Sequence, residues 1–431
     1  MKRLFLILTM LGLASAAQAQ QPGTPAATVI AIPPMTSPDT GPKGNEMLGL
    51  GWQATQMIAA DLRQTSELMP LLPNQKDYYS YPEVTAPTFS KWRSAGAKAL
   101  VTGFVQSRSD GRLTFGCYVY DVEKGRELGR KGFIVGSGEW RRAAHKCSGL
   151  AYEAITGAPG MFDTRIAYVA ESGTGDAMVK RLAVMDSDGF NHKYLTAGDT
   201  MVLTPRLSPN GAQIAYVSYT GGIPQVRLLD VGSGAQRAAV PGDAISFAPR
   251  FSPDGTRILF TMMNGANADI YITRRDGGVA QRLTTSPGID TDASFSPDGS
   301  KIVFESDRGG SQQLYVMDAD GSNQRRLSFG GGWYASPEWS PDGKWIAFTR
   351  RGSDGRRIGI IGADGTGEKT LTNGPMDEGP SWAVSSRELI FQRTDATSRT
   401  GLYRVTMDGS EPRQMSIPQG GSDPDWSGLM D

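Results

Sequence analysis

Short apolar strands recur at a constant interval through the second half of the chain. Runs of five mostly apolar residues occupy 165–169, 213–217, 257–261, 301–305, 345–349 and 388–392. Four of the runs follow a Ser-Pro-Asp-Gly turn or a close variant, at 208–211, 252–255, 296–299 and 340–343. The residues that head these turns stand 44 apart, and Trp382 and Trp426 continue the series after 43 and 44. Four short strands in a period of this length are typical of one β-propeller blade.

The repeat predicts six blades and a particular closure of the ring. The unit that begins at Arg165 supplies the second, third and fourth strands of a blade but has no first strand before it. A matching first strand occurs only near the C-terminus, in the segment SDPDWS at 422–427. We therefore expect residues 165–431 to form a six-bladed propeller in which the last strand completes the first sheet. This pairing removes an exposed sheet edge at the seam.

The segment 28–158 follows a different pattern. Alternating or continuous apolar runs predict strands at 27–34, 99–107, 112–122 and 129–136, whereas 45–68 and 139–156 have the spacing of helices. The order predicts a small α/β domain with a mixed sheet and two main helices. Residues 159–164 are the expected linker to the propeller.

The N-terminus has the pattern of an export signal. Lys2 and Arg3 precede an apolar stretch from Leu4 to Leu13, and Ala17-Gln18-Ala19 is a small-residue cleavage site. We expect a signal peptide over 1–19, cleavage after Ala19 and a flexible tail over 20–27. For a bacterial protein, this predicts a periplasmic location.

Charge and chemistry exclude several functions. Lys plus Arg and Asp plus Glu both total 44, so the chain has no excess of positive charge that would favour binding to nucleic acid. The only two histidines, His145 and His192, fall in different predicted domains, and no Gly-x-Ser-x-Gly motif occurs. The sequence therefore predicts no catalytic residue, no cofactor and no metal site, although acids at the channel mouth could attract a cation. Cys117 and Cys147 are either a disulfide, which an oxidising compartment permits, or two buried thiols.

The loops before the innermost strands are the main candidate site. In such a blade the first strand lies nearest the axis, so these loops open onto one rim of the channel. They combine apolar residues with acids, a mixture typical of protein interfaces. The alternative is that the aromatic side chains fold back onto the blades. The candidates are Asp243, Phe247, Ile289, Asp290, Asp292, Trp333, Tyr334, Met376, Asp377, Glu378 and Asp423.

Three segments are informative beyond the repeat, namely IAADLRQTSELMPL at 58–71, GAKALVTGFV at 96–105 and AITGAPGMFDTRIAYV at 154–169. Together with the propeller repeat, they resemble the TolB family, the periplasmic component of the Tol–Pal system. The resemblance implies a monomeric, non-enzymatic adaptor that supports outer-membrane integrity and constriction at division. It would bind the lipoprotein Pal at the propeller rim, and thereby the outer membrane, and the protein TolA through the N-terminal tail.

The same resemblance assigns further residues. Ile245 and Thr291 match Pal-contacting loop positions, and Gln20, Gln21 and Thr24 of the tail would contact TolA. The tail is shorter than the strand-forming segment that family members often carry there. The alternative function is a propeller hydrolase, a lactonase or glycosidase, that uses carboxylates of the channel.

Overall fold

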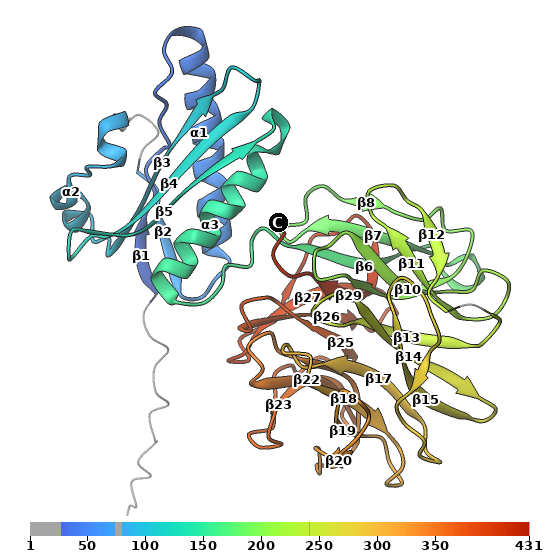
Figure 1. Cartoon of the computed structure of the whole chain (residues 1–431). Coiled ribbons are helices and arrows are strands. Elements are labelled where there is room, and N and C mark those ends of the chain that lie inside the picture. Colours follow the sequence, from blue (N-terminus) through green and yellow to red (C-terminus); the bar gives the residue numbers. More distant parts are fainter. Residues whose placement is uncertain (1–26, 74–79, 241, 431) are drawn as a thin grey trace, which may run out of the picture.

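The computed structural model describes residues 27–73, 80–240 and 242–430. Figure 1 shows an α/β domain, coloured blue to teal, beside a ring of sheets coloured green to red. None of the helices in the described part of the chain has the length and apolar character needed to span a bilayer.

The N-terminal domain is built on a five-stranded mixed sheet of order β2-β1-β3-β4-β5. β1 pairs in parallel with β2 and β3, and the remaining pairs are antiparallel. Two long helices, α1 and α3, cover one face, where Ile58 and Ala151 pack with Val101 and Phe115. The short α2 contributes Trp92 to a second cluster on the other face. The strands are β1 (Thr28–Ala31), β2 (Leu68–Leu71), β3 (Ala99–Ser107), β4 (Leu113–Asp121) and β5 (Arg126–Val135); the helices are α1 (Gly41–Arg63), α2 (Phe89–Ser94) and α3 (Trp140–Thr156), with short 3-10 turns at Tyr81–Val84 and Ser137–Glu139.

The first helix differs from its predicted bounds of 45–68. It begins earlier, at Gly41, because a proline is compatible with the first turn of a helix. It also ends earlier, at Arg63, since the Thr65 hydroxyl donates to the Leu62 carbonyl at 2.8 Å and closes the last turn. Leu68, which the apolar spacing had assigned to the helix, instead starts strand β2.

The two cysteines form a disulfide between β4 and α3. Cys117 and Cys147 are both fully buried, with their Cα atoms 5.9 Å apart. The bridge fastens α3 to the sheet it covers and spans 30 residues of sequence. A loop of that length corresponds to about 3 to 4 kcal/mol of stabilisation, chiefly through restriction of the unfolded chain.

The C-terminal part is a six-bladed propeller, and each blade is a four-stranded antiparallel sheet. From the axis outward, blade 1 consists of β29 (Gly420–Trp426), β6 (Arg165–Ser172), β7 (Val179–Asp186) and β8 (Lys193–Tyr194). Blade 2 consists of β9 (Val202–Leu207), β10 (Gln213–Ser218), β11 (Gln225–Asp230) and β12 (Gln236–Ala238). Blade 3 consists of β13 (Ser246–Phe251), β14 (Arg257–Asn264), β15 (Asn267–Arg274) and β16 (Gln281–Arg282).

The remaining blades repeat the same order. Blade 4 consists of β17 (Asp290–Phe295), β18 (Lys301–Ser306), β19 (Gln313–Asp318) and β20 (Arg325–Arg326). Blade 5 consists of β21 (Trp333–Trp339), β22 (Trp345–Gly352), β23 (Gly355–Gly362) and β24 (Lys369–Thr370). Blade 6 consists of β25 (Asp377–Trp382), β26 (Glu388–Thr394), β27 (Thr400–Thr406) and β28 (Arg413–Gln414).

The predicted closure of the ring is confirmed. β29 pairs with β6 in antiparallel register, with Ser422 opposite Val169 and Trp426 opposite Ile166. The Trp426 indole N–H donates to the Thr164 hydroxyl at 2.8 Å, which fixes the last strand against the entry to the first. The two ends of the propeller are therefore held in one sheet by hydrogen bonds.

The repeated turn is structural. In each copy the serine hydroxyl accepts the backbone N–H five residues further on, at 2.9 Å, and so joins the first strand to the second. The glycine of each turn has a positive φ between 65° and 74°, which residues with a Cβ rarely adopt. The four turns begin at Ser208, Ser252, Ser296 and Ser340.

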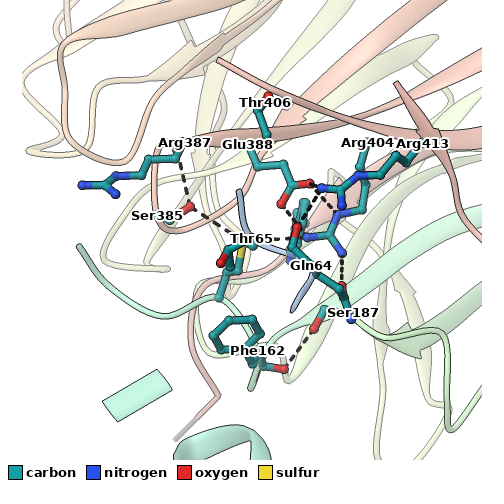
Figure 2. A network of polar contacts seen from close by, with 12 residues as sticks. Gln64, Thr65, Phe162, Ser187, Ser385, Arg387, Glu388, Arg404, Thr406 and Arg413 are labelled. Carbon is teal, nitrogen blue, oxygen red and sulfur yellow. Dashed lines mark hydrogen bonds and ion pairs between the residues drawn. The ribbon is translucent and has the colours of Figure 1, made fainter. Parts of the chain in front are cut away.

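A polar network joins the two domains (Figure 2). Buried Arg404 of β27 forms an ion pair with Glu388 at 2.5 Å and donates to the Gln64 side chain, just after α1, at 2.6 Å. Arg413 of β28 donates to the Gln64 carbonyl at 2.8 Å. The predicted linker runs through this junction, and its Phe162 is only 4% exposed. The end of α1 is thus tied directly to blade 6.

His145 forms a second, buried connection between the domains. Its Nδ1 lies 2.8 Å from Asp61 of α1, and its Nε2 lies 3.4 Å from Asp188 of blade 1. Burial alone lowers the pKa of this imidazole, but the two carboxylates outweigh that effect and raise the pKa to about 10. His145 is therefore a positive charge between two acids, one from each domain.

Candidate interaction face of the propeller

The N-terminal domain contacts one face of the ring, at blades 1 and 6. Arg387, in the turn after the first strand of blade 6, contacts Glu67 and Tyr152 of that domain. Asp188, in the turn between the last two strands of blade 1, contacts Arg141 at 2.5 Å. Because neighbouring strands of each blade are antiparallel, the opposite ends of all blades lie on the other side of the ring. We call this side the distal face, formed by the connections 173–178, 195–201, 219–224, 239–240, 242–245, 265–266, 283–289, 307–312, 327–332, 353–354, 371–376, 395–399 and 415–419.

The innermost strands share a bulge beneath the distal face. In each blade the pairing of the first and second strands shifts at one residue with a positive φ of 45° to 62°. This residue is followed by proline in five blades and by alanine in the sixth. Such a bulge locally bends the strand and redirects the residues that follow it. The six positions are Thr204, Ala248, Asp292, Ser336, Gly379 and Asp423.

Two residues after each bulge, a ring of polar side chains meets in the channel. Arg250 lies 2.8 Å from Glu338 and 3.4 Å from Asp425, and the Ser381 hydroxyl donates to Glu338 at 3.0 Å. Burial raises the pKa of Asp425 to about 6. The ring consists of Arg206, Arg250, Ser294, Glu338, Ser381 and Asp425, and its two acids are offset by two arginines.

The structure corrects the assignment of two predicted acids. Asp290 and Asp377 are fully buried and cannot contact a partner directly. Asp290 pairs with Arg308 at 2.7 Å, and Asp377 with Arg393 at 2.6 Å. Each pair fastens the start of an innermost strand to the end of the second strand of the same blade, because Arg393 lies near the end of β26 and Arg308 lies just after β18. These acids therefore stabilise the loops of the distal face through buried ion pairs and are not part of its surface.

Of the two predicted aromatic residues, one is buried against its blade and the other is exposed on the distal face. Tyr334 is fully buried and donates its hydroxyl to Glu368 at 2.7 Å, so it belongs to the fold. Trp333, its neighbour, is 51% exposed. The opposite orientations follow from the strand geometry of β21, in which successive side chains point to opposite sides.

The other predicted residues vary in their accessibility. Asp243 and Ile289 are exposed, whereas Ile245, Phe247, Asp292, Met376, Glu378 and Asp423 are half-buried. Thr291 is buried and accepts a hydrogen bond from Thr261 at 3.0 Å. Glu378 pairs with Arg356 at 2.6 Å. The free acids are therefore fewer than the sequence indicated.

The most prominent feature of the distal face is a pair of exposed aromatic rings with arginines over them. The Arg351 guanidinium lies 5.7 Å from the centre of the Trp333 ring. Phe329, which is 75% exposed, has the Arg326 guanidinium 5.1 Å from its ring centre. Neither guanidinium lies within 4.0 Å of a carboxylate among the described residues. We call Arg326, Phe329, Trp333 and Arg351 the aromatic ledge.

Sequence reasoning missed three members of this ledge. Phe329 lies three residues after the end of β20, the fourth strand of blade 4, and the strand pattern does not indicate whether its side chain is buried. Arg326 and Arg351 resemble any solvent-exposed strand residue in the sequence. The only available signal was an aromatic residue beside three glycines at 330–332.

Two further expectations concern residues or ions that the structure does not place. The tail residues Gln20, Gln21 and Thr24, and the signal segment 1–19, lie outside the described residues. Within the described ranges, no cluster of three His, Cys, Asp or Glu side chains could hold a metal ion.

Comparison with known proteins assigns the family. The model described as TolB beta propeller domain matches residues 152–430, and that described as TolB amino-terminal domain matches residues 21–128. The chain belongs to the TolB family. The expected resemblance and fold are thereby confirmed.

Individual relatives agree with this assignment. The chain is 50% identical over 212 residues to the Tol-Pal system protein TolB of Zymomonas mobilis, and 49% identical over 193 residues to that of Rhizorhabdus wittichii. These alignments span 46% and 44% of the relatives' lengths, and 49% and 44% of this chain. The crystal structure of TolB from Acinetobacter baumannii covers 93% of this chain and 97% of its own, with a TM-score of 0.78 and 29% identity.

Proposed function

We propose that this protein is a non-enzymatic, periplasmic adaptor of the Tol–Pal system that binds Pal at the distal face. Family membership supports this proposal, because the curated relatives carry the name Tol-Pal system protein TolB. Through Pal the protein would associate with the outer membrane and support its integrity and its constriction at division. TolA would bind the N-terminal region.

The observation that carries the proposal is the aromatic ledge on the face opposite the N-terminal domain. Trp and Arg are the residue types that most often dominate binding energy at protein interfaces. Exposed apolar patches with polar residues around them often mark protein interaction sites. Arg326 and Arg351, which lack carboxylate partners in the described structure, predict that the covering surface of Pal carries acids.

The test is titration calorimetry of the full chain with purified Pal. We expect Arg351→Glu to weaken binding at least tenfold, because it reverses one of the two unpaired charges. The matched control is Arg325→Glu, next to Arg326 on β20 and also exposed but outside the ledge. Equal losses for both variants, or no loss for either, would contradict the assignment of the distal face.

The TolA contact is tested separately. Removal of residues 20–27 from the mature protein should abolish capture of TolA on a sensor surface and leave Pal binding unchanged. Retained TolA capture would show that the contact lies elsewhere in the protein.

The hydrolase alternative has less support from the channel. Glu338 and Asp425, the acids of the polar ring, both lie close to Arg250 and are offset by it. A pair of glycosidase carboxylates must be free to donate and accept protons around a substrate. The adaptor is therefore the function that the site supports best.

A further inference from the structure

A cavity of about 1210 Å³ opens on the distal face between blade 6 and blade 1. Its walls are the hairpin 173–178 of blade 1, the hairpin 395–399 of blade 6 and the connection that follows β28. It lies at the seam where β29 joins the two ends of the ring. Sites for small molecules typically enclose about 300 to 1,000 Å³, so this space suits a longer occupant. We call it the closure groove.

The closure groove lies where blade 6 lacks a side chain that the other five blades have. The third strand of each blade has one equivalent position near its start, identified by its pairing with the second strand. In blades 1 to 5 this position holds a long or charged polar residue, and in blade 6 it holds Gly401. The five equivalents are Arg181, Gln225, Asp269, Gln313 and Arg357.

Four of those five side chains bridge the third strand and the loop that leads to the next blade, and the fifth pairs with the fourth strand. Four of them donate to a carbonyl of the loop that leads to the next blade, as Gln225 does to Gly242 at 2.8 Å and Gln313 to Gly332 at 3.0 Å. Arg181 and Arg357 make the same kind of contact at 2.9 and 3.1 Å. Asp269 pairs instead with Arg282 at 2.6 Å. Gly401 can make no such bridge between β27 and the loop 415–419, and the space beside it belongs to the closure groove.

The apolar part of the groove is rich in methionine. Met178, Met415, Ile417 and Tyr403 line it, and Met178 is 40% exposed. Methionine side chains are unbranched and polarizable, so they adapt to different apolar partners. Flexible, methionine-rich surfaces are typical of proteins that bind peptide segments of varied sequence.

Among the described residues of the groove, one charge lacks a partner of opposite charge. Glu171 is paired with Lys180 at 2.8 Å, and Arg393 with the buried Asp377. Asp395 accepts the backbone N–H groups of its own hairpin at 2.7 to 3.0 Å. The guanidinium of Arg399 is exposed and has no carboxylate within 4.0 Å among the described residues. The groove therefore presents an apolar floor beside an available positive charge.

We propose that the closure groove binds an extended peptide segment of a partner protein. An aliphatic or aromatic side chain of the segment packs among Met178, Met415 and Ile417, and an acidic side chain nearby pairs with Arg399. The closure groove is separate from the aromatic ledge. The protein that supplies the peptide segment can therefore be a partner other than Pal.

Gly401→Gln is the most direct test, since it restores the residue type that blades 2 and 4 carry at this position. Gly401 is not in the left-handed region, so a side chain there causes no backbone strain. An added Cβ would lie 3.1 Å from the flexible amide end of Gln414 and 3.4 Å from the Tyr403 ring. We expect this variant to fold with an unchanged melting temperature and with the groove closed.

The probe is a phage-displayed library of random ten-residue peptides, selected on the full immobilised chain. The proposal predicts enriched sequences that combine an apolar residue with Asp or Glu and that bind the Gly401→Gln variant at least tenfold more weakly. Arg399→Glu should shift the selected sequences from acidic to basic, a readout that does not depend on the first variant folding. Enriched peptides that bind wild type and both variants equally, or a library with no enrichment, would overturn the proposal.

A third measurement separates this proposal from the proposed function. Pal binding should survive Gly401→Gln if Pal uses only the aromatic ledge, and Trp333→Ala should leave peptide binding unchanged. Loss of peptide binding in Trp333→Ala would place the peptide site on the ledge and overturn the closure groove as its location.

Discussion

Truncation of Trp333 should be the most costly single change to Pal binding. Its side chain is 51% exposed, and a tryptophan can bury up to about 250 Å² in all, so about 130 Å² is available to a partner. At about 25 cal/mol per Å², complete coverage of that area contributes about 3 kcal/mol. Loss of that contribution corresponds to a rise in Kd of about a hundredfold.

The assay is titration calorimetry of Trp333→Ala with Pal, alongside two controls. Val279→Ala removes an even more exposed apolar side chain, 96% accessible, in the connection at 275–280 on the face that carries the N-terminal domain. It should leave the Kd unchanged. Trp333→Phe keeps most of the apolar area and should lose much less than Trp333→Ala. A Kd for Trp333→Ala within threefold of wild type would refute the reasoning that an exposed aromatic ring marks the binding face.

Three further predictions concern stability. Asp377→Ala leaves the half-buried Arg393 without its acid, so the free energy of unfolding should fall by about 1 to 3 kcal/mol in urea titrations, and a neutral result would contradict the structural role of this pair. The pKa of His145 is raised in the folded state, so its protonation stabilises the fold fully below about pH 6.5, and this stabilisation is lost as pH rises toward about 10. His145→Gln should therefore flatten the pH dependence of the melting temperature between pH 6.5 and 10. An unchanged profile would assign the pH dependence to other groups. Cys147→Ser removes the disulfide and should lower stability by about 3 to 4 kcal/mol under oxidising conditions, with no further loss on adding dithiothreitol, whereas continued sensitivity to the reductant would mean that another bond is reduced.

Periodicity explains why the sequence predicts the propeller well and the distal face less well. The turn that begins at Ser252 repeats because backbone geometry demands it, so blade count and closure by Trp426 can be read from spacing alone. No such constraint distinguishes Trp333 from Tyr334, whose burial depends on which side of β21 each faces. Asp290 resembles a rim acid in the sequence because Arg308, its partner, lies 18 residues away on another hairpin.

The closure groove was invisible in the sequence for a related reason. Gly401 is one of 54 glycines, and nothing local distinguishes it from a turn residue. The absence of a side chain at Gly401 becomes clear only when the third strands of the six blades are aligned by their pairing with the second strands. The early end of α1 was missed because Leu68 continues the helical apolar spacing by coincidence, although it belongs to a strand.

Hydrogen exchange of the full chain with and without Pal tests the central claim most directly. The account predicts slower exchange on binding in the distal connections 283–289 and 327–332. It predicts no direct protection of the turns that begin at Ser208 and Ser252, which lie at the other ends of their blades. Protection confined to those turns, or to the outer surface of the N-terminal domain, with none at 327–332, would contradict it.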